Sequence, residues 1–90
     1  GHNVITRAGG KYSLRMDKTF LFVADEQTQG NAMLSAAEFQ GNTVKVSAVL
    51  QDETEIRCLV DDQIFLQNDF QVGMKINVKW KEKDMHKLKT

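Results

Sequence analysis

The stretch from Ala36 to Val60 constrains the fold of this chain more than any other part of its sequence. From Val44 to Leu50 apolar and polar residues alternate, which is the period of a strand with one buried face. A polar, turn-like break at residues 51–54 follows, and alternation resumes over residues 55–60. The segment therefore predicts two antiparallel strands joined by a short loop.

Further strands are expected on both sides of this hairpin, because two strands alone are at best marginally stable in water. Residues 74–80 alternate almost as cleanly, and residues 12–23 predict a strand, a tight turn and a second strand. Residues 32–39 favour a strand over a helix, since they span only about two helical turns and run straight into the hairpin. Gly41 predicts a bulge or a tight turn where the chain bends.

The remaining segments carry weaker signals. Residues 1–10 lack periodicity and end in Gly9-Gly10, which predicts a linker or turn, and Gly1-His2 also fits the remnant of a cleaved tag. Residues 24–31 are predicted to form a polar loop and residues 61–69 a less regular segment. Residues 81–88 are predicted to form a helical turn or a bend that leads into a last short strand.

These patterns together predict an all-β fold. Five to seven short antiparallel strands, turns every eight to twelve residues and no long helical pattern are typical of a small barrel or sandwich, and an OB-like barrel fits best. A chain of 90 residues forms one domain with a small core. The predicted core is the apolar side of the hairpin and of the strand at residues 74–80: Val44, Val46, Leu50, Ile56, Cys58, Ile76, Val78 and Trp80.

Composition limits the setting of the protein. The chain is 41% apolar, and it contains no run near the ~20 apolar residues that a membrane-spanning helix needs, so we expect a soluble protein without membrane insertion. Its single cysteine, Cys58, cannot form an internal disulfide and is expected to be a buried, inert thiol. A reducing, cytosolic setting fits these features best.

Charge is balanced overall but unevenly distributed. Residues 1–70 carry six basic and ten acidic side chains, whereas residues 71–90 carry six lysines against two acids. A basic end can mark a nucleic-acid partner, but Lys75 and Lys79 also fit the solvated face of a strand.

Aromatic residues decide between these two interpretations. Proteins that bind single strands stack bases on exposed aromatic rings among basic residues. Phe39 and Trp80 are predicted on the core side of their strands, which leaves Tyr12 and one of Phe20 or Phe22 as stacking platforms. The core interpretation is favoured, and no nucleic-acid partner is expected.

No catalytic or metal-binding constellation is evident. Gly9-Gly10-Lys11 resembles a phosphate loop, but Ile5 and Tyr12 occupy positions where that motif needs glycine and a hydroxyl residue. His2 and His86 lack a partner at metal-ligand spacing, and Asp61-Asp62 lacks the glycine and glutamate of a calcium loop. Glu53 and Glu55 fit solvated charges beside a hairpin turn. We therefore expect no catalytic residue, metal or cofactor, and neither binding nor hydrolysis of ATP.

Four segments show a pattern in common with a known family, at residues 14–21, 37–41, 72–80 and 82–88. In order and spacing they resemble four motifs of the TOBE domain. The first two are an apolar-Arg-Pro-Glu turn and a strand that ends in Glu-Phe-Leu-Gly. The last two are a Gly-x-x-Val-x-apolar-x-Trp strand and a closing Pro-Glu-Asp-Val-His-x-Leu. Met16 and Glu82 stand where that family usually has proline. Residues 1–5 are similar to the junction that follows the ATPase domain in these subunits, one residue short.

The resemblance implies a function. The TOBE domain is the non-catalytic C-terminal accessory domain of ATP-binding subunits of ABC importers for polyamine, iron, sugar or similar solutes. Residues 1–10 would then join an upstream ATPase domain, which would hold ATP and Mg, and residues 11–90 would form the accessory domain. The implied location is cytoplasmic, at the inner face of the cell membrane. The implied partners are the chain's own ATPase domain, a second copy of the subunit and, indirectly, the permease.

Dimerisation and solute sensing are the two roles that the resemblance implies. Phe65, Leu66 and Phe70 are the candidate dimer interface, and their alternative is to plug one end of the barrel. Two other functions stay open at this point: a free-standing OB-like domain that binds nucleic acid, and one that binds an oxyanion.

Overall fold

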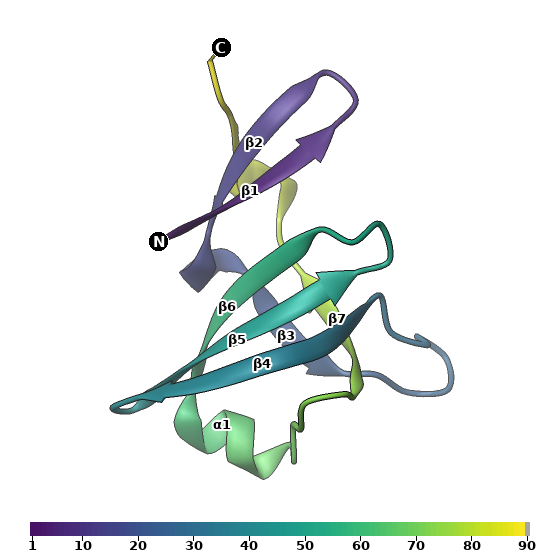
Figure 1. The fold of residues 1–90 in the computed structure, drawn as a ribbon, viewed down its shortest axis with the longest axis vertical. Helices are drawn as coiled ribbons and strands as arrows, with labels where there is room; N and C mark the ends of the chain where they lie inside the picture. The colour runs from purple at the N-terminus through teal and green to yellow at the C-terminus, as the bar shows by residue number, and fades with distance from the viewer. Residues whose placement is uncertain (90) are drawn as a thin grey trace.

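The computed structural model describes residues 1–89, which form two antiparallel sheets in the strand orders β1-β2-β8 and β3-β7-β4-β5-β6 (Figure 1). The strands are β1 (His2–Arg7), β2 (Gly10–Arg15), β3 (Phe20–Val23), β4 (Ala32–Gln40), β5 (Thr43–Leu50), β6 (Glu55–Asp61), β7 (Lys75–Lys79) and β8 (Met85–Lys87). One α-helix, α1 (Asp62–Gln67), and two 3-10 turns, η1 (Met16–Lys18) and η2 (Glu82–Asp84), complete the fold. The all-β prediction is confirmed, with eight strands instead of five to seven.

The predicted hairpin is the centre of the larger sheet. β5 pairs with β6 in the register Val46↔Cys58, and β4 pairs with β5 on its other side. Gly41 has a φ of +65° at the first position of the two-residue loop between β4 and β5. Of the two predicted alternatives, a bulge or a tight turn, Gly41 therefore forms the tight turn. The bulge lies elsewhere in β4, where the register shifts between Leu34 and Ala36.

The larger sheet curls into a barrel-like shape. β7 pairs with both β4 and β3, and β3 in turn contacts β6, the strand at the opposite end of the sheet order. No hydrogen-bonded ladder joins β3 to β6 within residues 1–89, so the barrel is partly open. The hairpin of β1 and β2 stands at one end of the molecule and α1 lies at the other (Figure 1).

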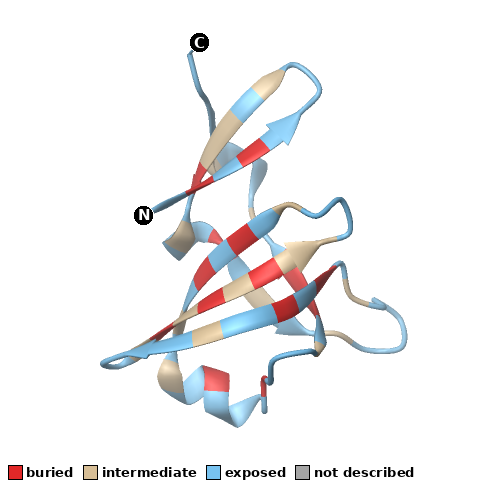
Figure 2. Ribbon diagram, in the orientation of Figure 1, coloured by how far each residue is buried: buried red, intermediate tan, exposed pale blue. Residues whose placement is uncertain are grey.

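The core lies inside this curled sheet, where buried residues alternate with partly buried ones along β5 and mostly with exposed ones along β6 (Figure 2). Six of the eight predicted core residues are buried: Val44, Val46, Ile56, Cys58, Ile76 and Val78. Leu50 and Trp80 are only partly buried and pack against the edge of the core. The reason is their position, because Leu50 ends β5 beside a loop and Trp80 follows the last residue of β7.

The linker prediction for residues 1–10 is wrong for most of that segment. β1 pairs with β2 along its whole length, and Ile5 is buried. Alternation did not predict this strand because the inward-facing Asn3 is polar and the outward-facing Val4 is apolar. The turn prediction for Gly9-Gly10 fits, since Ala8 and Gly9 connect the two strands.

Residues 61–69 contain a helix where the sequence indicated an irregular segment. The carboxylate of Asp61 accepts hydrogen bonds from the backbone N–H groups of Gln63 and Ile64, at 2.9 and 3.2 Å, and so caps α1. A helix of six residues is too short to show a helical period in sequence. Capping, together with the burial of Phe65 beneath the sheet, stabilises it instead.

The helix and the residues after it bury two of the three residues that were predicted as a dimer interface. Phe65 and Phe70 are only 6% and 5% exposed, so both belong to the core, and they plug one end of the barrel. Their ring centroids are 5.6 Å apart, and Phe39 packs edge-on against Phe65. Of the three predicted interface residues, only Leu66 is exposed, at 59%.

Candidate functional site

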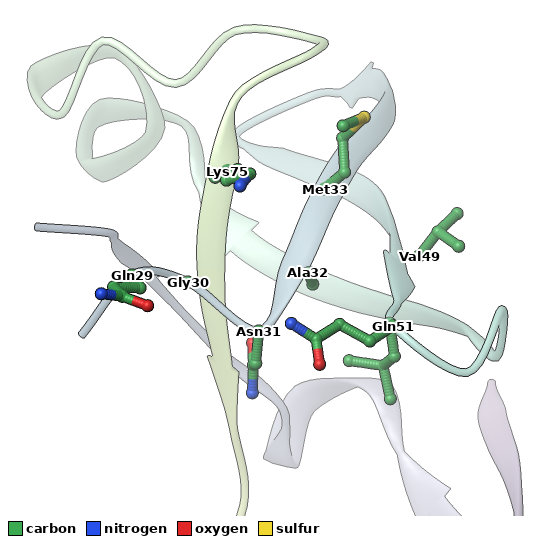
Figure 3. Close-up of a pocket in the computed structure, with 9 residues that line it drawn as sticks. Gln29, Gly30, Asn31, Ala32, Met33, Val49, Gln51 and Lys75 are labelled. Atoms are coloured by element: carbon green, nitrogen blue, oxygen red, sulfur yellow. The ribbon is translucent and has the colours of Figure 1, made fainter.

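A groove of about 790 Å³ opens beside the paired ends of β4 and β5 (Figure 3). This volume lies within the ~300–1,000 Å³ range that is usual for small-molecule sites. The groove is lined by two loops and three strands: Gln29, Gly30, Asn31, Ala32, Met33, Val49, Leu50, Gln51 and Lys75. The lining contains one amine, that of Lys75, together with carboxamides and apolar side chains, a composition that suits ligand binding.

Strand register builds the outer wall of the groove. Met33 on β4 stands opposite Val49 on β5 and opposite Lys75 on β7. Paired residues of neighbouring strands lie on the same face of a sheet, so these three side chains form one row on the outer face. Figure 3 shows them on three adjacent strands beside the loops. The row therefore presents two apolar side chains next to one ammonium group.

Backbone geometry fixes the loop that borders the groove. Gln29 and Gly30 both have positive φ, +57° and +74°. A Cβ at Gly30 would lie 3.0 Å from the backbone oxygen of Ile76, so the loop can approach β7 this closely only with glycine. Asn31 then attaches the loop to β7: its Nδ2 donates to the oxygen of Val78 at 2.9 Å, and the N–H of Val78 donates to its Oδ1 at 2.8 Å.

The first half of the same loop is held by Asp25. Its Oδ1 accepts hydrogen bonds from the N–H groups of Gln27 and Thr28, and these bonds, chiefly that from Thr28, hold the pKa of Asp25 below its ordinary value. The hydroxyl of Thr28 accepts from the amide of Asn77 at 2.8 Å. This contact explains why Asn77 is buried although the alternation of β7 placed it on the solvated face.

Comparison with known protein families matches residues 12–88 to the TOBE domain. The chain belongs to the TOBE domain family. The match begins in β2 and runs to the residue after β8, so it includes the whole larger sheet and leaves β1 before it. Neither a search of curated proteins nor a search of solved structures found a match.

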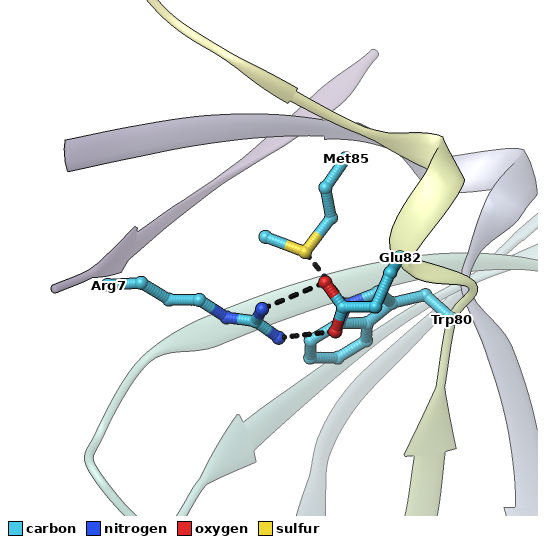
Figure 4. Close-up of polar contacts among 4 residues, drawn as sticks. All are labelled: Arg7, Trp80, Glu82 and Met85. Atoms are coloured by element: carbon cyan, nitrogen blue, oxygen red, sulfur yellow. Dashed lines mark hydrogen bonds and ion pairs between the residues drawn. The ribbon is translucent and has the colours of Figure 1, made fainter. Parts of the chain in front are cut away.

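In this TOBE domain, polar contacts surround the segment that leads from β7 to β8. The guanidinium of Arg7 at the end of β1 binds both carboxylate oxygens of Glu82, at 3.0 and 3.1 Å (Figure 4). Close by, the indole N–H of Trp80 donates to the sulfur of Met85 at 3.1 Å. These contacts link β1 to η2 and the end of β7 to β8, and the Arg7–Glu82 pair among them is exposed on the surface.

The other residues considered from the sequence are dispersed over the TOBE domain. Cys58 is buried, and burial raises the pKa of its thiol, although a hydrogen bond with Thr19 partly opposes the shift. Glu55 pairs with Arg57 at 2.8 Å on the exposed face of β6. Glu53 has a φ of +70° in the turn before β6. The structure therefore does not bring these groups together into one site.

The exposure of aromatic rings differs from the prediction. Phe20 and Phe22 both face outward from β3, 43% and 48% exposed, and Lys79 places its Nζ 5.3 Å from the ring centroid of Phe22. Phe39 is 55% exposed although it shares the inward face of its strand with Leu34. It lies next to the last residue of β4 and packs edge-on against Phe65. The exposure of Phe39 could not be inferred from alternation, which places this residue on the inward face.

Proposed function

We propose that this TOBE domain is the non-catalytic accessory domain at the C-terminal end of the ATP-binding subunit of an ABC importer. The observation that carries the proposal is the family match over residues 12–88, which takes in the complete larger sheet. ATP and Mg would be held by an ATPase domain that precedes Gly1, on the cytoplasmic face of the membrane. The structure of residues 1–89 contains no helix long enough to cross a membrane.

In this proposal the domain acts through contacts. Two copies of the subunit would meet through their accessory domains, which would hold the ATPase domains near each other between cycles of hydrolysis. Leu66 on α1 and the exposed ring of Phe39 offer apolar surface for such a contact. The transported solute would be a polyamine, iron, a sugar or a similar compound, and the domain would adjust activity when it senses solute.

The test is a deletion in the intact subunit. Removal of residues 11–90 is expected to leave basal ATP hydrolysis within about twofold of the full subunit, because the ATPase centre lies upstream. Dimer retention by sedimentation and solute-dependent regulation of hydrolysis should be lost. Loss of ATP binding itself would contradict the proposal, and so would stoichiometric, Mg-dependent ATP binding by the 90-residue chain in calorimetry.

One observation favours a second candidate, a domain that binds single-stranded nucleic acid. Phe20 and Phe22 are two residues apart on an extended strand, about 6.6 Å, with Lys79 beside them, which resembles a stacking platform. A titration with single-stranded oligonucleotide at low and high salt decides the matter. Tight binding that weakens steeply with salt and is lost in Phe22→Ala would support this candidate over the accessory domain.

A further inference from the structure

We propose that the groove beside β4 and β5 is a binding site for a small organic anion, with Lys75 as the group that binds the negative charge. The inference rests on the proposed function for its biological role, as the site at which the domain would sense solute. Binding itself needs no ATPase domain and can be measured on the 90-residue chain.

Charge selects the class of ligand. Lys75 is the one charged residue among the nine that line the groove. The ion pairs formed within residues 1–89 are Arg7–Glu82, Arg15–Asp17 and Arg57–Glu55, and Lys75 takes part in none of them. A polyamine or a ferric ion would meet a like charge here and no carboxylate to bind it. A carboxylate or phosphate would instead gain a charge-assisted hydrogen bond.

The remaining lining residues fit the rest of such a ligand. Gln29 and Gln51 place carboxamides on the two loops that border the groove, and a carboxamide can both donate to and accept from hydroxyl groups. Neither of these two side chains takes part in the hydrogen bonds that fix the loop at residues 25–31. Met33 and Val49 add an apolar wall for a carbon skeleton. A hydroxylated organic anion, such as a sugar phosphate, therefore matches the groove.

The site is also largely preformed. Asn31 attaches its loop to the backbone of β7 by two hydrogen bonds, and Asp25 orders the residues before it. Met33, Val49 and Lys75 stand on paired strands of one sheet. Binding would thus order mainly the side chains of Lys75, Gln29 and Gln51, which limits the entropic cost of binding.

The experiment is an NMR titration of the backbone amides of the 90-residue chain with three probes: glucose 6-phosphate, glucose and spermidine. Glucose 6-phosphate is expected to shift the amides of residues 29–33, 49–51 and 75 in a saturable manner. Glucose should bind at least about tenfold more weakly, because it lacks the charge that pairs with Lys75. Spermidine should leave these amides unchanged.

A matched pair of variants tests the assignment to Lys75. Lys75→Gln removes the charge in the groove, whereas Lys79→Gln removes one from the same face of the same strand outside it. The first should weaken binding of glucose 6-phosphate about tenfold or more, and the second by less than about twofold. Equal effects of the two variants would show unspecific attraction to lysines. That result, absence of any saturable shift, or preferential binding of spermidine would overturn the proposal.

Failure here is distinguishable from failure of the proposed function. If the groove binds no anion but deletion of this domain abolishes regulation of the attached ATPase, the accessory role is supported and the anion site is refuted. If the chain binds the anion but its deletion does not change ATP hydrolysis by the subunit, the anion site is supported and the accessory role is refuted.

Discussion

The carboxamide of Asn3 forms with Arg57 the two hydrogen bonds that a neighbouring strand would form. Its Nδ2 donates to the backbone oxygen of Arg57 at 2.8 Å, and the N–H of Arg57 donates to its Oδ1 at 2.7 Å. Asn3 lies on β1 and Arg57 on β6, the edge strand of the other sheet, so one side chain joins the two sheets. Asn31 binds the backbone of Val78 in the same way.

Asn3→Ala is expected to lower the free energy of unfolding by about 1–3 kcal/mol, because it removes the acceptor of the Arg57 N–H, whereas the Arg57 oxygen still accepts from the hydroxyl of Thr19. Urea denaturation measures the change. Thr6→Ala, at an exposed position of the same strand, serves as the control and should have less than about 0.5 kcal/mol of effect. An Asn3→Ala variant as stable as the parent would mean that water replaces the carboxamide at no cost.

Trp80→Ala is expected to destabilise the domain by about 2 kcal/mol, below the ~3–5 kcal/mol typical of a fully buried aromatic residue. The sequence predicted a core anchor, but Trp80 is only partly buried at the edge of the core. Trp80→Phe keeps one aromatic ring but removes the other ring of the indole and the N–H that donates to Met85, so it should cost less than Trp80→Ala. Thermal melting measures both, and a melting temperature of Trp80→Ala within a degree or two of the parent would place the side chain outside the packing.

Leu66→Asp and Phe70→Asp are expected to have opposite consequences. Phe70 is buried, so a carboxylate there should unfold the domain, whereas Leu66 is exposed and should tolerate the change. Under the proposed function, Leu66→Asp should weaken self-association in sedimentation without lowering the melting temperature. If that variant associates like the parent, the dimer contact lies elsewhere, and a folded Phe70→Asp variant would contradict the core position of the ring.

The domain is expected to lose stability in acid partly through Asp25. Hydrogen bonds from Thr28 and Gln27 favour the carboxylate and lower the pKa of Asp25 in the folded state. The stabilisation is therefore present above the unfolded value, about pH 4, and is lost as pH falls through the folded pKa. Urea denaturation from pH 6 to pH 2 should show a shallower decline for Asp25→Asn. Equal slopes for the parent and Asp25→Asn would exclude the contribution.

The sequence by itself determined the strands whose alternation is long. β5, β6 and β7 each place apolar residues on every second position because one face of the sheet is buried, and the hairpin turn at Gly41 follows from glycine's freedom to adopt positive φ. Burial of Cys58 and Ile76 follows from the same period. The order and spacing of motifs also determined the family, since they resembled the TOBE domain that residues 12–88 match.

Only the tertiary structure decided which weak segments gain order from contacts distant in sequence. β1 pairs with β2 and is attached to the larger sheet where Asn3 binds the backbone of Arg57, and α1 is stabilised because Asp61 caps it while Phe65 packs into the core. The groove depends on Met33, Val49 and Lys75 from three strands, and the pairing that brings Lys75 of β7 beside Met33 of β4 joins segments far apart in the sequence. Periodicity reports which face of an element is apolar. It does not report which distant residue will cover that face, because the covering contacts form only when the sheet curls and its strand ends pack against the loops.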